Sequence, residues 1–188
     1  MPPHPRAAVR VELLIGGLIL ALLLGIMIPV LRSTYQTSQI LRCRQQLDQM
    51  YKAVLTYAES YGGYPPLHGP TAADPDWRDR IAPFLYPEYG APPRSTDPLW
   101  ACPAGGSYAG NHNIFCPAPP QLTSFLLRKE VGVIADANDR AARTGVTDFD
   151  GVEWRHRGGT NVVLIDGSVK WVKRASARWT RRHWNQPQ

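Results

Sequence analysis

His156 and Asp166 are the two residues near the C-terminus whose types could do chemistry together. They are separated by nine residues within "RHRGGTNVVLIDGSVKWV", residues 155–172. A histidine and an aspartate that met across a hairpin could share a proton or bind a metal ion. The same residues could instead mark the places where a small sheet turns. The choice between these interpretations separates an enzyme from a structural subunit.

Turn signals on both sides of the strand-like run 160–166 favour the architectural interpretation. Asp166-Gly167 is a strong two-residue hairpin signal, and Gly158-Gly159 predicts another turn. His156 and Asp166 are then expected at opposite ends of one strand, roughly 25–30 Å apart at full extension. The two-residue turn predicts a register that collects apolar side chains on one face: Val162, Leu164, Val169 and Trp171.

A membrane-tethered hydrolase is the sharpest enzyme hypothesis. Ser107 lies in "GGSYAG", and Ser107, Asp136 and His156 follow the chain order of α/β-hydrolase triads. Ala109 replaces the second glycine that the nucleophile elbow requires, and no apolar strand precedes Ser107. We therefore predict no catalytic residue in this chain and keep the hydrolase as an alternative.

Acidic and amide side chains between residues 136 and 150 are a second group of metal candidates. Their oxygens are of the kind that calcium accepts, although their spacing fits no defined calcium loop. Such residues are also common in solvated turns. We predict no cofactor and no metal, with calcium as a weak alternative on Asp136, Asn138, Asp139, Asp148 and Asp150.

An uncharged apolar run extends from Leu13 to Leu31. At about 1.5 Å per residue it matches the thickness of a hydrocarbon core. Amphipathic spacing continues beyond it without a break, and Gly62-Gly63 followed by Pro65-Pro66 supplies a stop. We predict one helix from about residue 11 to residue 61, a membrane anchor in its first half, with a kink or loosened turn at Pro29.

The cysteines indicate whether the head lies in an oxidising or a reducing compartment. Cys102 and Cys116 flank a glycine- and proline-rich stretch, and a disulfide between them would close a loop at a gain of about 3 kcal/mol. Such a bridge needs an oxidising compartment. Two free thiols are the alternative, and Cys43, on the predicted helix, is either free or able to pair between subunits.

Residues 64–120 hold most of the prolines, and we expect irregular structure there with one short helix at about 77–86. Strand-like runs then occupy 130–137, 151–157, 160–166 and 168–174. The fold class predicted is α+β, with a long N-terminal helix and a small antiparallel sheet.

The formal net charge of +6 is unevenly distributed: residues 1–32 carry +2, residues 33–154 carry −3 and residues 155–188 carry +7. In the C-terminal stretch Trp179 and Trp184 interleave with Arg178, Arg181 and Arg182. Stacking and phosphate pairing could make this a DNA-binding tail. We favour an ordinary solvated basic tail over nucleic-acid contact.

Several separated motifs resemble one family, the prepilin-like, pseudopilin-related proteins with a C-terminal His-x9-Asp-Gly motif (planctomycete type). Glu12-Leu13-Leu14 resembles the prepilin-type N-terminal motif, and "CRQQLDQMYKAVLTYAESYGGYPP" (43–66) is similar to the family's Cys-x-x-x-Leu helix ending in Gly-x-x-Pro-Pro. "VIADA" and residues 155–172, with His156, Gly158, Gly159, Asp166 and Gly167, resemble its final sheet.

The resemblance implies a type II secretion-like pseudopilin or pilus subunit. It assigns subunit assembly to Glu12, which would pair with a neighbour's amino terminus; the alternative is that Glu12 reaches the lipid headgroups. Prepilin peptidase cleavage, followed by methylation, would fall between Ala7 and Ala8. The family prefers Gly and Phe there, and Arg10 stands where an apolar residue is usual, which puts processing in doubt.

These observations define a predicted organisation. Residues 1–10 form a cytoplasmic leader, 11–31 the transmembrane half of the helix, 32–63 its amphipathic half, 64–174 the head and 175–188 a basic tail. The expected partners are other pilin-like subunits, inner-membrane assembly machinery and prepilin peptidase. We expect a single-pass protein of the cytoplasmic membrane, with its N-terminus inside and its head in the periplasm or outside the cell.

Overall fold

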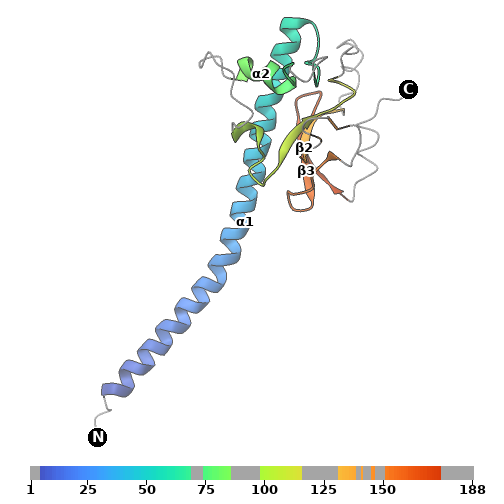
Figure 1. The fold of residues 1–188 in the computed structure, drawn as a ribbon. Helices are drawn as coiled ribbons and strands as arrows, with labels where there is room; N and C mark the ends of the chain where they lie inside the picture. Colours follow the sequence, from blue (N-terminus) through green and yellow to red (C-terminus); the bar gives the residue numbers. More distant parts are fainter. Residues whose placement is uncertain are drawn as a thin grey trace. The chain divides into compact units, whose positions relative to one another are not determined.

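The computed structural model describes residues 5–68, 74–85, 98–115, 131–138, 141, 145–146 and 151–174. Contacts divide the chain into two compact units, Met1–Ser38 and Gln39–Gln188. The predicted α+β fold is confirmed: a long apolar N-terminal helix is followed by a small antiparallel sheet (Figure 1).

Helix α1 (Pro5–Tyr61) ends where the sequence predicts. Gly62 has a φ of 76° and its N–H donates to the carbonyl of Ala58 at 2.8 Å, which closes the last turn. The helix continues through Pro29. Ala7, Ala8 and Glu12 lie in the helical backbone, and their side chains are outside the described part of the structure.

The first unit is apolar and exposed. Large aliphatic side chains between Leu14 and Leu31 are 42–73% exposed. This segment is long and apolar enough to cross a membrane. Water-exposed apolar surface of this extent is unusual for a soluble monomer, which is the physical reason to look for a partner or a lipid phase.

Helix α2 (Trp77–Leu85) also lies close to its predicted range. Asp76 caps it, since its Oδ1 accepts from the backbone N–H of Arg78 at 2.8 Å and of Asp79 at 3.2 Å. In turn, Asp79 Oδ2 accepts a hydrogen bond from the backbone N–H of Asp76. These reciprocal bonds satisfy N–H groups that the first turn leaves without partners.

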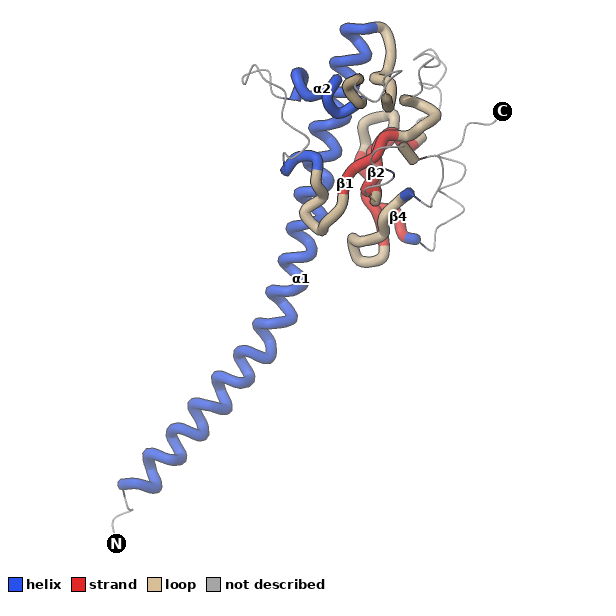
Figure 2. The backbone as a smooth tube through the Cα atoms, in the orientation of Figure 1, coloured by secondary structure: helices blue, strands red, loops and turns tan. Residues whose placement is uncertain are grey.

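The sheet has the order β1-β2-β3-β4, with every neighbouring pair antiparallel. Figure 2 shows its strands in red. Its strands are β1 (Ser107–Gly110), β2 (Gly132–Ala137), β3 (Gly159–Leu164) and β4 (Val169–Lys173), and the short 3-10 helix η1 (Pro98–Trp100) precedes β1. The sequence predicts β2, β3 and β4 but misses β1. The predicted strand at 151–157 is wrong, because this stretch forms only isolated bridges at Val152 and His156.

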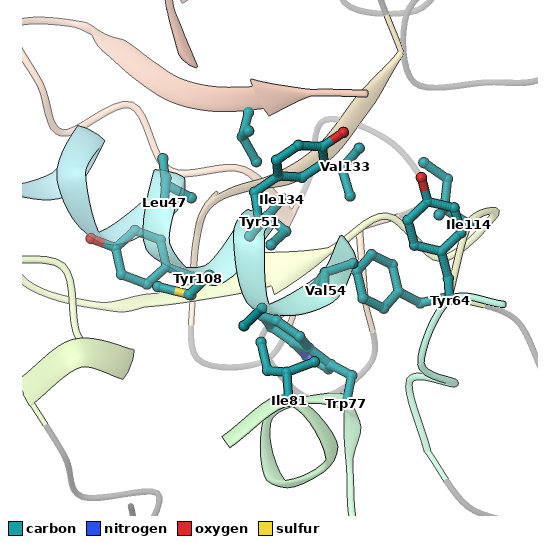
Figure 3. Close-up of a cluster of buried hydrophobic side chains, with 14 of the residues drawn as sticks. Leu47, Tyr51, Val54, Tyr64, Trp77, Ile81, Tyr108, Ile114, Val133 and Ile134 are labelled. Atoms are coloured by element: carbon teal, nitrogen blue, oxygen red, sulfur yellow. The ribbon is translucent and has the colours of Figure 1, made fainter. Parts of the chain in front are cut away.

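Two cores cover the sheet. One packs residues of α1 and α2 against it, including Leu47, Tyr51, Val54, Trp77, Ile81, Tyr108, Val133 and Ile134 (Figure 3). The other, on the opposite face, is built from small and β-branched residues such as Ala109, Ala135, Val162, Leu164 and Val172. Because both faces are covered, every residue of β2 and β3 is buried.

The β3–β4 hairpin differs by one position from the predicted register. Val163 pairs with Val169 and Asn161 pairs with Trp171, so the loop has three residues, not two. Only Gly167 in this loop has a positive φ, of 82°, whereas the predicted type I′ turn needs positive φ at Asp166 as well. A one-residue slip exchanges the faces of a strand.

The predicted apolar face is therefore divided between the two sides of the sheet. Val162 and Leu164 belong to the core on the side away from α1. Val169 packs on the other core, and Trp171 is 40% exposed.

Candidate metal centre

Four buried side chains converge in the head: Cys43 from α1, Cys102 from the loop after η1, Asp136 from β2 and His156 from the turn before β3. One potential ligand atom of each lies within 4.8 Å of those of the other three. None of the four residues is more than 3% exposed. All four belong to the second unit of the chain.

Cys43 is placed by helix periodicity. It precedes Leu47 by four residues and Met50 by seven, and all three are fully buried on one face of α1. The same face carries Tyr51 and Val54 into the core (Figure 3). The sulfur of Cys43 therefore points toward the sheet.

Cys102 is placed by a tight turn. Its N–H donates to the carbonyl of Gly106 at 2.9 Å, and its carbonyl accepts from the N–H of Gly105 at 2.8 Å. Gly105 and Gly106 have φ values of 97° and 72°, which side chains rarely adopt. The backbone of Ala104, in the same turn, contributes to lowering the pKa of the Cys102 thiol.

His156 is placed by a second turn. Its N–H and carbonyl both bond to Gly159, at 3.0 and 3.1 Å, and the two residues between them, Arg157 and Gly158, have φ values of 55° and 74°. This is the pattern of a type I′ hairpin turn. The turn is therefore Arg157-Gly158, one residue before the predicted Gly158-Gly159, and Gly159 is the first residue of β3.

Short polar contacts connect the four side chains. The Cys43 thiol donates to Asp136 Oδ1 at 2.9 Å, Asp136 Oδ2 lies 3.2 Å from His156 Nε2, and that nitrogen lies 3.2 Å from Cys102 Sγ. Asp136 pairs with Tyr108 across β1 and β2. The cluster thus joins one helix, one loop, one strand and one turn.

Asn161 and Trp171 form a second layer. The backbone N–H of Asn161 donates to Asp136 Oδ2 at 2.9 Å, and its amide Nδ2 donates to Cys43 Sγ at 3.2 Å. Trp171 Nε1 donates to the carbonyl of His156 at 2.8 Å. These contacts fix the carboxylate, one sulfur and the backbone that carries the imidazole.

The cluster shifts the acidities of its own members. The hydrogen bond from Cys43 lowers the pKa of Cys102 to about 6, against the opposing effect of burial and with help from His156. Burial raises the pKa of Cys43. Burial also lowers the pKa of His156, but hydrogen bonds to Asp136 and Cys102 outweigh it and bring that pKa to about 9. The pKa shifts of Cys102 and His156 thus favour the ionised thiol of the one and the protonated imidazole of the other.

The geometry is not that of a nucleophilic triad. In such a triad one ring nitrogen of histidine faces the nucleophile and the other faces the carboxylate. Here the same atom, His156 Nε2, faces both Cys102 and Asp136. The arrangement instead resembles a set of ligands around one central point, with soft sulfur, imidazole nitrogen and carboxylate oxygen as donors.

The structure brings together two of the three residues that the hydrolase hypothesis requires. Asp136 and His156 are in contact as it requires. Ser107 begins β1 and pairs with Ala137, and the His156 Nε2 that should activate a hydroxyl is directed at Cys102 and Asp136.

One prediction about the cysteines needs correction. Cys102 is a free thiol, so the predicted bridge to Cys116 is not formed; the Cys102 sulfur is turned into the buried cluster, and Cys116 lies outside the described residues. Asp136, one of the calcium candidates, contacts Cys43, Asn161 and His156.

Of the other calcium candidates, Asn138 lies in the described part of the chain. Asn138 Oδ1 accepts from the N–H of Ala141 at 2.8 Å, as a helix-capping side chain does. Asp139, Asp148 and Asp150 are outside the described part of the chain.

His156 and Asp166 do not share a site, as predicted, because β3 separates them and only His156 belongs to the cluster. Asp166 is exposed, and its Oδ1 accepts from the N–H and hydroxyl of Ser168. The hydrolase alternative grouped Asp136 with His156, but no sequence pattern pointed to Cys43 and Cys102 as their neighbours. The available signals were an aspartate inside the apolar strand "GVIADA" and a cysteine on the apolar face of a helix, since both predict buried polar groups that need partners.

Comparisons of the chain with protein-family models, curated proteins and solved structures found no match.

Proposed function

We propose that this chain is a membrane-anchored, pilin-like subunit that assembles through its N-terminal helix into a pilus or a type II secretion-like pseudopilus. The main support for this proposal is that α1 combines an exposed apolar segment with a segment whose side chains form part of the core of the head. The proposal assigns this protein no catalysis of its own.

The apolar segment supports membrane insertion. From Leu14 to Leu31 it contains no charged residue, and at about 1.5 Å per residue it spans roughly 27 Å. A hydrocarbon core is about 30 Å thick. Since the aliphatic side chains are exposed all along this segment, burial in lipid or against neighbouring helices would be strongly favourable.

The head supports a structural role. The polar cluster of Cys43, Cys102, Asp136 and His156 is enclosed, and buried residues of α1 from Cys43 onward provide much of one core. The resemblance described above adds assembly through Glu12, with the head in the periplasm or outside the cell.

Photo-crosslinking in the native cell envelope tests this function. A photoreactive phenylalanine analogue placed at Leu18, Leu22 or Ile26, one face of the exposed segment, should trap the chain with itself or with related subunits in a ladder of products. The analogue at Lys170, exposed on β4, serves as the control for contacts outside the anchor. A chain that gives only monomer at all three anchor positions contradicts the proposal. This probe leaves the native cysteines unchanged.

A further inference from the structure

We propose that Cys43, Cys102, Asp136 and His156 bind one zinc ion, which fastens α1 to the sheet of the head. This site goes beyond the assembly function proposed above and does not depend on it. Its ligands all lie in the second unit of the chain and come from four segments far apart in the sequence.

The ligand atoms have nearly the spacing that zinc needs. Zinc in a tetrahedral site lies about 2.3 Å from sulfur and about 2.0–2.1 Å from nitrogen or oxygen, which separates neighbouring ligand atoms by about 3.3–3.8 Å. The contacts of 2.9 Å between Cys43 Sγ and Asp136 Oδ1 and of 3.2 Å between His156 Nε2 and either Asp136 Oδ2 or Cys102 Sγ are slightly shorter, and no separation within the set exceeds 4.8 Å. Side-chain adjustments of up to about 1 Å, with one oxygen of Asp136 as the ligand, would place the four atoms around one ion.

The donor set selects the metal. Two sulfurs, one imidazole and one carboxylate suit zinc, whereas calcium takes six to eight oxygens and magnesium prefers oxygen and water. Because all four ligands are protein side chains and all are buried, no coordination position is left for a substrate. The class of site is therefore structural, not catalytic.

Burial explains why an ion would be held strongly. Asp136 is fully buried, and a carboxylate in such a place is costly unless an opposite charge compensates it. A zinc ion would supply that opposite charge in direct contact with the carboxylate, and it binds cysteine as the thiolate and histidine as the neutral imidazole.

The hydrogen-bond donors around the cluster point at the ligand atoms, as the outer contacts of a zinc site do. Metal ligands are usually oriented by outer hydrogen bonds, whose removal weakens affinity about 10–100-fold. Here the backbone N–H of Asn161 donates to Asp136 and its side-chain amide donates to Cys43. Each of these donors points at a ligand atom that becomes or remains anionic in the zinc-bound state.

Elemental analysis of the full chain, extracted in detergent from zinc-replete cells and freed of loose metal, tests the site. We expect one zinc ion per chain in the wild type, and near-complete loss in Cys102→Ser and His156→Gln. His112→Gln is the matched control, because His112 is exposed and outside the cluster, and it should retain the ion. Zinc that survives both cluster substitutions overturns the proposal.

A second measurement separates loss of ligands from failure to fold. Wild-type protein reconstituted with Co²⁺ should show the visible bands of tetrahedral cobalt together with thiolate-to-metal charge-transfer bands. Alkylation of denatured protein followed by mass spectrometry reports whether Cys43 and Cys102 are thiols or a disulfide.

Metal-free wild type overturns the zinc site in either thiol state. Two free thiols would identify the cluster as a hydrogen-bonded network, and a disulfide would identify a cystine. Neither result alters the crosslinking expected of the anchor, so the two proposals fail independently.

Discussion

The carboxylate of Asp136 contacts His156 Nε2 at 3.2 Å, and both side chains are almost completely enclosed. The contact joins the middle of the sheet to the turn that starts β3. A buried charge of this kind is tolerated only while its partner is present, because removing one member leaves the other without solvent or counter-charge. The pair is therefore the point at which the head should be most sensitive to a change of charge.

Asp136→Asn should destabilise the head by about 3–5 kcal/mol, since it removes the charge while nearly preserving size. Asp48→Asn is the matched control: Asp48 forms an exposed pair with Lys52 one helical turn away, and such pairs contribute about 0.3–0.5 kcal/mol. Denaturant unfolding of the full chain in detergent, followed by tryptophan fluorescence, measures both. Equal losses in the free energy of unfolding would show that the buried charge of Asp136 stabilises the head no more than an exposed ion pair does.

Metal removal should lower the melting temperature of the wild type. A ligand that binds only the folded state at a free concentration of 100 times its Kd contributes about 2.7 kcal/mol. A strong chelator should abolish this contribution, and added zinc should restore it. The Cys102→Ser variant should not respond to either treatment, so a chelator effect that persists in Cys102→Ser would assign the response to another site.

Much of the fold follows from local sequence patterns. Helix α1 ends at Tyr61 because Gly62-Gly63 and two prolines follow a long periodic run, and α2 begins at Trp77 after the capping residue Asp76. The strands β2, β3 and β4 coincide with apolar runs bounded by turn residues. Strand β1 was missed, since "SYAG" has no apolar periodicity and becomes a strand only by pairing with β2.

The candidate site could not be assembled from the same patterns. Cys43, Cys102, Asp136 and His156 have no mutual spacing that belongs to a metal motif, because each arrives from a different element. Their meeting depends on which face of α1 packs on the sheet and on the sheet order. The register of β3–β4 was likewise set by a tertiary preference, in which Val163 and Val169 face one core and Val162 faces the other.

The three-residue hairpin loop makes a prediction at Gly167. Its φ of 82° is unfavourable for a side chain, and an added Cβ would lie 3.2 Å from the ring of Tyr51. Gly167→Ala should therefore cost about 1–3 kcal/mol. Chemical unfolding of the full chain measures the loss.

Asp166→Gly distinguishes the two registers of this hairpin. Asp166 does not have a positive φ, and it caps Ser168, so the substitution should also destabilise, by about 1 kcal/mol. A stabilising effect of Asp166→Gly would instead favour the two-residue type I′ loop.

Gly159 is constrained by crowding. A Cβ there would lie 2.3 Å from the indole of Trp171, the side chain that donates to the carbonyl of His156. Gly159→Ala should cost about 1–3 kcal/mol, as overpacking typically does. The double variant Gly159→Ala/Trp171→Ala should be more stable than additivity of the two single changes predicts.

Gly158→Ala controls for backbone strain in this experiment. Gly158 has a φ of 74° and no atom within 4 Å of its added Cβ, so Trp171→Ala should not relieve any cost there. Unfolding midpoints of the single and double variants provide the comparison. Additive effects of Gly159→Ala and Trp171→Ala would remove the crowding explanation.

Membrane insertion can be tested at the centre of the exposed apolar segment. Lysine at the middle of a spanning helix costs about 3 kcal/mol, so Leu22→Lys/Leu23→Lys should release the chain from membranes. Tyr35→Lys, at an exposed position beyond the apolar run, should leave it in the membrane fraction. Alkaline carbonate extraction followed by immunoblotting measures both. Because the head contributes none of this apolar surface, its thermal unfolding should be the same in the two variants. A double-lysine chain that stays fully in the carbonate-resistant pellet would mean that the segment does not hold the protein in the bilayer.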